Sequence, residues 1–203
     1  MFVNHLYATS EVLPPFGDYL CEYITAAGGI FVRARRPGLE ALLPVCQNYG
    51  ADIRGLAQVE PYVRLEGGLI SGEVIGQALE WMRQSAPLEL LTWIRWERGY
   101  SAFRPAQSTT TSRCRPLDPC NPLGQNALLD FHSHGLHEPM FSTVDNLDEK
   151  NGFRLFAVAG GFPCPSILVR VGIYGHFWNI PPVWVMELPE EVVAAQEGEL
   201  LWI

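Results

Sequence analysis

The sequence predicts a fold of the α/β or α+β class, in which several strands are combined with a few helices. Short apolar runs bounded by glycine and proline recur along the chain, which is typical of strands, and only a few segments show the 3.6-residue period of a helix. Hydrophobic residues make up 48% of the 203 residues, which is enough for one folded domain with its own core.

Residues 1–66 are expected to form a β-rich N-terminal extension, and the functional domain is placed at 67–203. Apolar runs at 29–32 and 62–65 lie between turn signals that contain proline and glycine. One early helix is expected at 19–26. The sequence of this extension indicates no particular function.

The clearest helix begins after Ser71, a candidate N-cap. Glu73 falls in its first turn, where an acidic side chain is favourable, and apolar residues recur at helical spacing from Ile75 to Met82. Pro87 marks its end, because proline disfavours a helical conformation in the residue before it. The elements after it are expected in this order: a strand at 88–96, a loop at 108–122, a strand at 127–134, a short helix near Ser142, strands at 153–158, 167–174 and 183–188, and a final helix that opens at Pro189.

The charge balance argues against nucleic-acid and membrane partners. The chain has 14 Lys and Arg against 22 Asp and Glu, a formal net charge of −8, whereas nucleic acid and anionic lipid require a basic face. Three arginines, Arg33, Arg35 and Arg36, are expected to be solvated. The N-terminus lacks the features of a signal peptide, and the apolar stretch at 155–169 is too short and too broken to span a bilayer. We therefore expect a cytoplasmic protein with reduced cysteines.

The residues that carry chemistry are His132 and His134, at the end of the strand expected at 127–134. Residues two apart on a strand project to the same face, so both imidazoles can bind one cation. Taken alone, such a pair is more typical of two histidines that face solvent or a polar cleft at the end of a strand. A turn and the helix near Ser142 would bring the carboxylate of Asp145 over the imidazoles. Two histidines and one aspartate leave the fourth position of tetrahedral zinc open, which is typical of catalytic zinc.

The pattern H-S-H-x7-S-x2-D resembles the JAMM motif of the JAB/MPN metallopeptidase family. Gly135 departs from it, since the family usually has proline after the second histidine. The family also has a glutamate at the start of a strand that follows a helix, commonly in a Pro-x-Glu context, and Pro87-Leu88-Glu89 is similar. The residues after Glu89 lack the family's glycine-rich run, so Glu97 remains an alternative.

The resemblance implies a JAB/MPN-like fold, a mixed β-sheet flanked by helices in a layout similar to that of cytidine deaminases. It implies one Zn²⁺ per chain, with His132, His134 and Asp145 as ligands. Glu89 would act as general base and later pass its proton to the leaving amine, and Ser142 would donate a hydrogen bond to the oxyanion. Apart from the resemblance, Ser142 and Asp145 suit an ordinary helix cap, and Glu89 suits an exposed acid at a strand edge.

The implied activity is hydrolysis of a peptide or isopeptide bond. The run H-S-H-G and the continuation at 152–160 resemble the bacterial group called PRTRC system protein A, which implies the tail of a ubiquitin-like or sulfur-carrier protein as substrate and an E1/ThiF-like partner. The alternative is a non-catalytic MPN scaffold for protein contacts, although scaffold members typically lose zinc ligands. The signatures H-E-x-x-H and P-C-x-x-C, which define other zinc enzymes, are incomplete here.

Four other side chains are expected to have lesser roles. Asp130 shares a strand face with the two histidines, and either orients an imidazole or lies at the edge of the core. His137 and Glu138 are expected to line the cleft, and His176 is expected to pack among aromatic residues.

Overall fold

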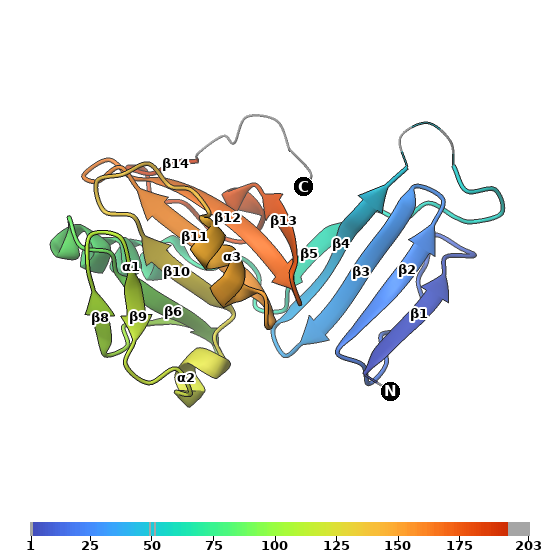
Figure 1. Cartoon of the computed structure of the whole chain (residues 1–203), viewed down its shortest axis with the longest axis horizontal. Coiled ribbons are helices and arrows are strands. Elements are labelled where there is room, and N and C mark those ends of the chain that lie inside the picture. The colour runs from blue at the N-terminus through green and yellow to red at the C-terminus, as the bar shows by residue number, and fades with distance from the viewer. Residues whose placement is uncertain (1, 49, 51, 195–203) are drawn as a thin grey trace.

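The structure, a computed structural model, describes residues 2–48, 50 and 52–194 and shows an α/β protein with two main sheets (Figure 1). The predicted class, strands combined with a few helices, is confirmed. The strands of the first sheet, in spatial order, are β1 (Val3–Tyr7), β2 (Cys21–Ala26), β3 (Gly29–Arg36), β4 (Leu39–Gln47) and β5 (Tyr62–Leu65).

The second sheet is mixed and lies beside three short helical segments and one longer helix. Its strands, in spatial order, are β13 (His176–Ile180), β12 (Ser166–Ile173), β11 (Phe153–Gly160), β10 (Leu129–Ser133), β6 (Leu91–Trp96) and β7 (Tyr100–Phe103), with β14 (Val193–Ala194) paired to β12. The other elements are α1 (Gly72–Ser85), α2 (Pro122–Gln125), α3 (Thr143–Glu149), the 3-10 helix η1 (Pro182–Trp184) and a hairpin of β8 (Gln107–Thr109) and β9 (Cys114–Pro116). Among the described helices, none has both the length and the apolar character that a membrane span requires.

The helix expected at 19–26 is wrong, because this segment contains β2. The strand pairs in parallel with β1 and antiparallel with β3. Cys21 and Tyr23 pack into one apolar cluster, whereas Ile24 and Ala26 pack into another. This alternation is the two-residue period of a strand with both faces covered, which sequence periodicity alone does not separate from a short buried helix.

Helix α1 forms where the sequence predicts the clearest helix. The Oγ of Ser71 accepts a hydrogen bond from the backbone N–H of Val74 at 3.5 Å, which caps the first turn. The buried residues of its apolar face are Ile75, Ala78, Leu79 and Met82. They belong to the main core, so α1 covers one face of the second sheet.

One apolar core joins the two sheets. Val32 and Leu43 of the first sheet belong to the same buried cluster as residues of α1, β10, β11 and β12. Arg36 also crosses the junction, where its Nη1 donates a hydrogen bond to the carbonyl oxygen of Phe153 at 3.0 Å. The first sheet is therefore attached to the second by packing as well as by the chain.

Three further predictions about elements are wrong in the described part of the chain. The loop expected at 108–122 contains most of the β8–β9 hairpin and the first residue of α2, and the β-branched Thr109 at the end of β8 suits a strand. No strand forms at 183–188, because Pro182, which has no backbone N–H to donate to a sheet, opens η1 just before it. At Pro189 the chain makes a turn that leads into β14, and the remainder of the expected final helix, 195–203, lies outside the described residues.

The order of strands places the sequence motif at one end of the second sheet. Strand β10 is antiparallel to β6 and parallel to β11. Parallel neighbours require a crossover connection, and α3 lies in the crossover from β10 to β11. Three segments therefore meet at one end of the sheet: the carboxyl end of β10, the start of α3 and the start of β6. Ligand sites of α/β sheets usually lie at the carboxyl ends of strands.

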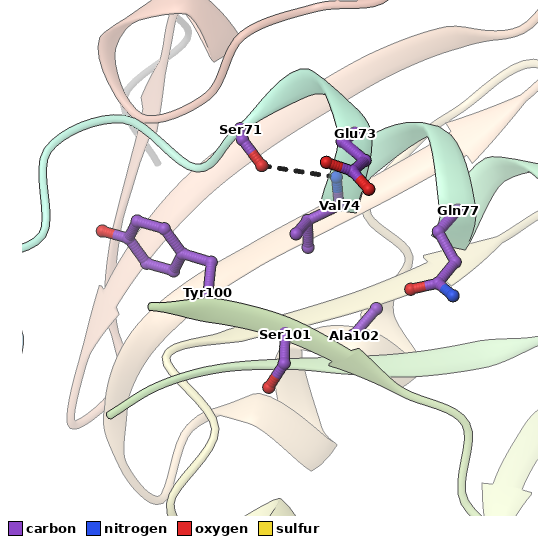
Figure 2. A pocket seen from close by; sticks show the side chains of 7 residues that line it. All are labelled: Ser71, Glu73, Val74, Gln77, Tyr100, Ser101 and Ala102. Atoms are coloured by element: carbon purple, nitrogen blue, oxygen red, sulfur yellow. Dashed lines mark hydrogen bonds between the residues drawn. The ribbon is translucent and has the colours of Figure 1, made fainter. Parts of the chain in front are cut away.

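A separate groove of about 380 Å³ lies between the start of α1 and β7 (Figure 2). Its lining residues are Ser71, Glu73, Val74, Gln77, Tyr100, Ser101 and Ala102. None of them belongs to the sequence motif, so this groove is distinct from the candidate site.

Candidate metal centre

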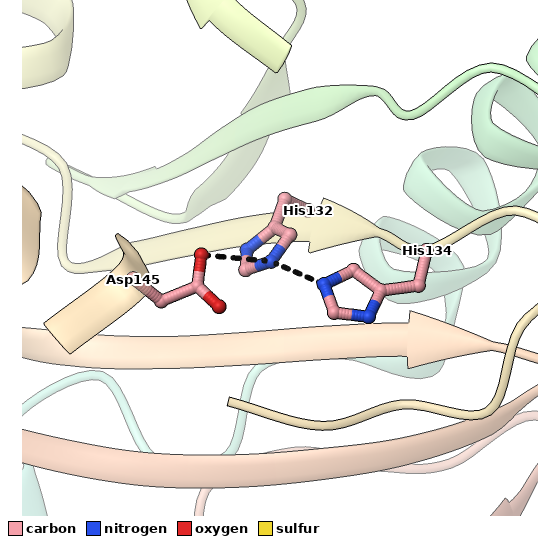
Figure 3. A group of neighbouring side chains, drawn as sticks. All are labelled: His132, His134 and Asp145. Carbon is pink, nitrogen blue, oxygen red and sulfur yellow. Dashed lines mark hydrogen bonds and ion pairs between the residues drawn. The ribbon is translucent and has the colours of Figure 1, made fainter. Parts of the chain in front are cut away.

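Three potential ligands converge at the end of β10 (Figure 3). His132 lies on the strand, His134 follows it, and Asp145 lies in the first turn of α3. One donor atom from each residue lies within 4.8 Å of the other two. Among the described residues, this is the group of histidine, cysteine and acidic side chains that is able to hold a metal ion.

The spacing of these atoms matches that of ligands around one small cation. Zinc–nitrogen bonds are about 2.0–2.1 Å long, so two nitrogens at corners of a tetrahedron lie about 3.3–3.4 Å apart. Nε2 of His132 is 3.3 Å from Nε2 of His134 and 3.6 Å from Oδ1 of Asp145. The first distance is longer than usual for a direct hydrogen bond between two nitrogens. The donor set therefore fits a tetrahedral metal ion.

The cap of α3 orients the Asp145 carboxylate. Oδ2 of Asp145 accepts hydrogen bonds from the backbone N–H of Ser142 at 2.6 Å and from its hydroxyl at 2.7 Å. The Ser142 Oγ in turn accepts the backbone N–H of Asp145 at 3.2 Å, which completes a capping box. Because Oδ2 is bound in this way, Oδ1 is the oxygen that faces His132. The capping signal predicted near Ser142 is confirmed, and it also fixes a candidate ligand.

Burial favours the neutral form of both histidines. It lowers the pKa of His132, an effect that the charge of Asp145 opposes. It also lowers the pKa of His134, which is raised in part by Asp145 and by a hydrogen bond with the backbone of Glu138. A metal-bound histidine typically uses its second ring nitrogen in such a bond. Neutral imidazoles are the form that binds metals, so this environment suits ligands.

Glu89 lies beside the cluster and is only 8% exposed. Burial, followed by the negative charge of Asp145, raises the pKa of Glu89 to about 7. Its backbone N–H donates to the carbonyl oxygen of Thr110 in the turn of the β8–β9 hairpin, at 2.8 Å. The alternative interpretation of Glu89 as an exposed acid at a strand edge is wrong, because only 8% of the residue is exposed.

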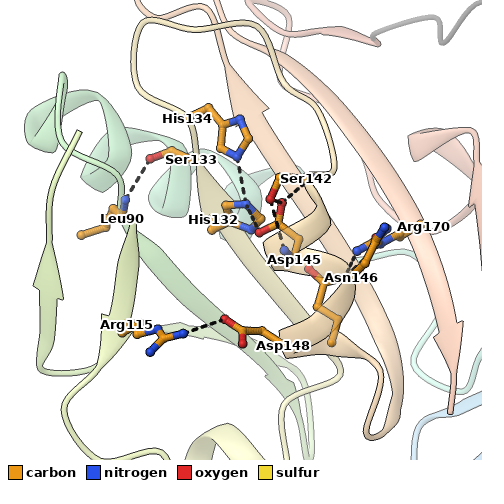
Figure 4. A network of polar contacts seen from close by, with 11 residues as sticks. Leu90, Arg115, His132, Ser133, His134, Ser142, Asp145, Asn146, Asp148 and Arg170 are labelled. Carbon is orange, nitrogen blue, oxygen red and sulfur yellow. Dashed lines mark hydrogen bonds and ion pairs between the residues drawn. The ribbon is translucent and has the colours of Figure 1, made fainter. Parts of the chain in front are cut away.

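Ser133, between the two histidines, ties the end of β10 to the start of β6 through Leu90 (Figure 4). The buried Ser133 hydroxyl accepts the backbone N–H of Leu90 at 3.0 Å, and the backbone N–H of Ser133 donates to the carbonyl oxygen of Leu90 at 3.0 Å. The residue next to Glu89 is thus held in register with the residue between the ligands.

Glu97 lies at the other end of β6. It is 70% exposed, forms an ion pair with Arg95, and its backbone N–H bonds to the carbonyl oxygen of Gly99 in a hairpin turn. The structure therefore brings Glu89 to the cluster and keeps Glu97 away from it.

Gly135 stands where the JAMM motif usually has proline, and the backbone at this position explains why proline does not fit. Its φ of +56° lies in the left-handed region, whereas proline is fixed near −65°. A Cβ at Gly135 would also lie 2.6 Å from the carbonyl oxygen of Pro87. Glycine thus lets the chain turn directly after His134 and pass close to the segment that precedes Glu89.

Other residues singled out in the sequence have structural roles. Asp130 accepts hydrogen bonds from Nη1 of Arg154 at 2.9 and 3.0 Å, so it pairs with an arginine of the neighbouring strand β11. His176 lies 2.8 Å from the Tyr23 hydroxyl and packs edge-on against its ring, as expected for a histidine among aromatic residues. Arg33 is buried against Glu22, which corrects the expectation that it is solvated.

Two neighbours of the site were not foreseen. Burial, with Glu89 and Asp145 nearby, raises the pKa of the Cys114 thiol to about 12, which keeps it protonated. Arg170 of β12 is buried under α3. Neither residue belongs to a local sequence pattern, so only the fold shows that they are near.

The chain matches no protein-family model and no curated protein. Fold and site together define it as an α/β protein with a candidate three-ligand metal centre at the carboxyl end of a central strand.

Proposed function

We propose that the protein is a zinc-dependent hydrolase of the JAMM type, which cleaves a peptide or isopeptide bond. The observation that carries the proposal is the convergence of His132, His134 and Asp145 beside the buried carboxyl group of Glu89. Structural zinc sites are almost always closed by four protein ligands, whereas this cluster offers three. The H-S-H-x7-S-x2-D pattern supports a JAB/MPN-like domain, and the strand–helix–strand order around it is compatible with one.

The three ligands would hold Zn²⁺, and Glu89 would move the protons. When bound, zinc acts as a Lewis acid and lowers the pKa of a coordinated water to about 7. Glu89 accepts the proton that water loses as it attacks the scissile carbonyl, and then donates it to the leaving amine. A base must lie close to the water whose proton it accepts, and Glu89 is buried beside the residues that would hold the metal.

Ser142 is proposed to have two tasks. Its hydroxyl orients Asp145, and it is also the candidate donor to the oxyanion of the tetrahedral intermediate. A serine hydroxyl has one proton, so donation to the oxyanion requires that the bond to Oδ2 of Asp145 be released. The backbone N–H of Ser142 keeps its own bond to Oδ2, at 2.6 Å, and preserves the orientation of the carboxylate meanwhile.

The proposed substrate is the C-terminal tail of a ubiquitin-like or sulfur-carrier protein, with an E1/ThiF-like partner. An extended tail binds well along a strand edge, where main-chain hydrogen bonds supply affinity. The β8–β9 hairpin is a separate two-stranded sheet, and its turn contacts the backbone of Glu89. The turn of this hairpin thus lies next to Glu89, and its strands are proposed to border the substrate groove.

A panel of fusion proteins tests this proposal. Ubiquitin-like and sulfur-carrier proteins with a Gly-Gly terminus joined to a reporter would be incubated with zinc-loaded protein. We expect cleavage after the Gly-Gly terminus, and its loss after treatment with a chelator. Cleavage of unrelated peptides alone would contradict the substrate class, and a zinc-loaded protein that cleaves nothing would favour the non-catalytic scaffold.

A further inference from the structure

We propose that Arg170 is a positioning residue for the metal centre, which anchors α3 to the sheet and so sets the position of Asp145. This inference rests on the proposed function in one respect only, namely that His132, His134 and Asp145 bind a metal.

Helix α3 has little apolar anchoring of its own. It has seven residues, and none of them is buried. Its two large apolar side chains, Val144 and Leu147, are 48% and 62% exposed. Toward the β8–β9 hairpin, Asp148 reaches Arg115 of β9 at 3.4 Å, but both side chains are exposed, and such pairs contribute little. Something other than apolar burial must hold the helix that carries the third ligand.

Arg170 supplies this attachment by hydrogen bonds to two positions of the helix. It lies on β12 and is 4% exposed. Its Nη1 donates to Oδ1 of Asn146 at 2.6 Å, and its Nε donates to Oε2 of Glu149 at 2.9 Å, with Nη2 on the same oxygen. Asn146 follows Asp145 directly (Figure 4). Glu149 lies about one turn further along α3.

Two aromatic rings hold the guanidinium in place. Its central carbon lies 3.9 Å from the ring centroid of Phe141 and 4.1 Å from that of Phe177. Phe141 precedes Ser142, the N-cap of α3, so Arg170 contacts the chain on both sides of Asp145. A lysine could not replace it, because a point charge neither stacks between rings nor donates in a planar fork.

The first sheet contains a matched control. Arg33 is also 4% exposed, donates from Nε to Oε2 of Glu22 at 3.0 Å, and lies over the ring of Phe16 at 5.4 Å. Loss of either arginine removes the cationic partner of a glutamate side chain that is at most 10% exposed. Only one of the two pairs contacts the helix that bears a ligand.

The experiment measures zinc affinity by competition with a chelator, and coordination geometry from the absorption spectrum of Co²⁺-loaded protein. We expect Arg170→Met to weaken zinc affinity by about 10–100-fold, as loss of residues that support metal ligands typically does, and to alter the Co²⁺ spectrum. Arg33→Met should lower the melting temperature but leave zinc affinity and the spectrum unchanged. Glu149→Gln, a milder change that retains a hydrogen-bond acceptor, should shift affinity in the same direction as Arg170→Met, by less.

The outcomes separate this inference from the proposed function. Wild-type affinity and spectrum in both Arg170→Met and Glu149→Gln would overturn the positioning role while leaving the metal centre intact. Equal weakening by Arg33→Met would overturn it too, since the effect would then reflect general destabilisation. A wild-type protein that binds neither zinc nor Co²⁺ would overturn the metal centre and, with it, this inference.

Discussion

Strand β6 has a glutamate near each end, and the two are in opposite environments. Glu89, just before the strand, is covered by the β8–β9 hairpin and the end of β10, and burial together with Asp145 raises its pKa to about 7. Glu97, just after it, is exposed in a hairpin turn and paired with Arg95. The two residues have the same chemistry and nominally face the same side of one strand. What surrounds each carboxyl group, and not its residue type, decides which one is able to act as a base.

The largest expected effect is on turnover. Glu89→Gln should reduce cleavage of a Gly-Gly fusion by about 10²–10⁴-fold, the usual contribution of a positioned acid or base, while zinc stays bound. Glu97→Gln, the matched variant at the other end of β6, should retain full turnover. Initial rates on one substrate, with zinc content checked in each variant, measure the difference. The reverse pattern would assign the base to Glu97.

The second effect concerns the stability of the metal-free protein. The folded state raises the pKa of Glu89, so it retains a proton that the unfolded state releases. Stability should therefore fall as pH rises from about 4.5 to about 7, and change little above that range through this group. Allowing for partial screening by solvent, the loss is on the order of 2 kcal/mol.

Urea unfolding of chelator-treated protein at several pH values measures this effect. Glu89→Gln should remove the part of the fall in stability between pH 4.5 and 7 that Glu89 contributes, and Glu97→Gln should not. Glu149, whose pKa burial raises to about 8, contributes equally in both variants. A pH profile that is identical in wild type and Glu89→Gln would show that the carboxyl group is not shielded from water as the structure has it.

A smaller effect separates the two caps. Ser142→Ala and Ser71→Ala each remove a serine N-cap and should each cost about 1 kcal/mol of unfolding free energy. Only Ser142 also holds the Asp145 carboxylate, so only Ser142→Ala should weaken zinc affinity, by about 10-fold. Zinc titration of both variants tests this, and an equal affinity in the two would deny Ser142 its orienting role.

The sequence was most informative where local chemistry determines structure. The periodicity and capping of α1, the strand with both histidines and the capping box at Ser142 were all predictable, because each depends on neighbours in the chain. The candidate ligands also followed from spacing along one crossover. Segments such as β2 were not predictable, since an apolar run covered on both faces shows no simple period.

Contacts between segments far apart in the chain could not be predicted from the sequence, for a different reason. The burial of Glu89 depends on the hairpin at 107–116, and the support of α3 depends on Arg170, which lies on a strand beyond β11. Only strand order brings these residues together. Similarly, the sequence shows Gly135 only as a departure from the JAMM motif. The structure shows that glycine is required there, because a Cβ would clash with the carbonyl oxygen of Pro87.

The metal content of the protein tests the central claim most directly. Protein purified without added metal should contain one zinc per chain by elemental analysis. Asp145→Asn and His132→Ala should lose it, whereas Asp148→Asn, an exposed aspartate three residues further along α3, should keep it. Full zinc occupancy in both ligand variants, or a wild-type protein that neither contains zinc nor takes it up, would contradict the assignment of this site.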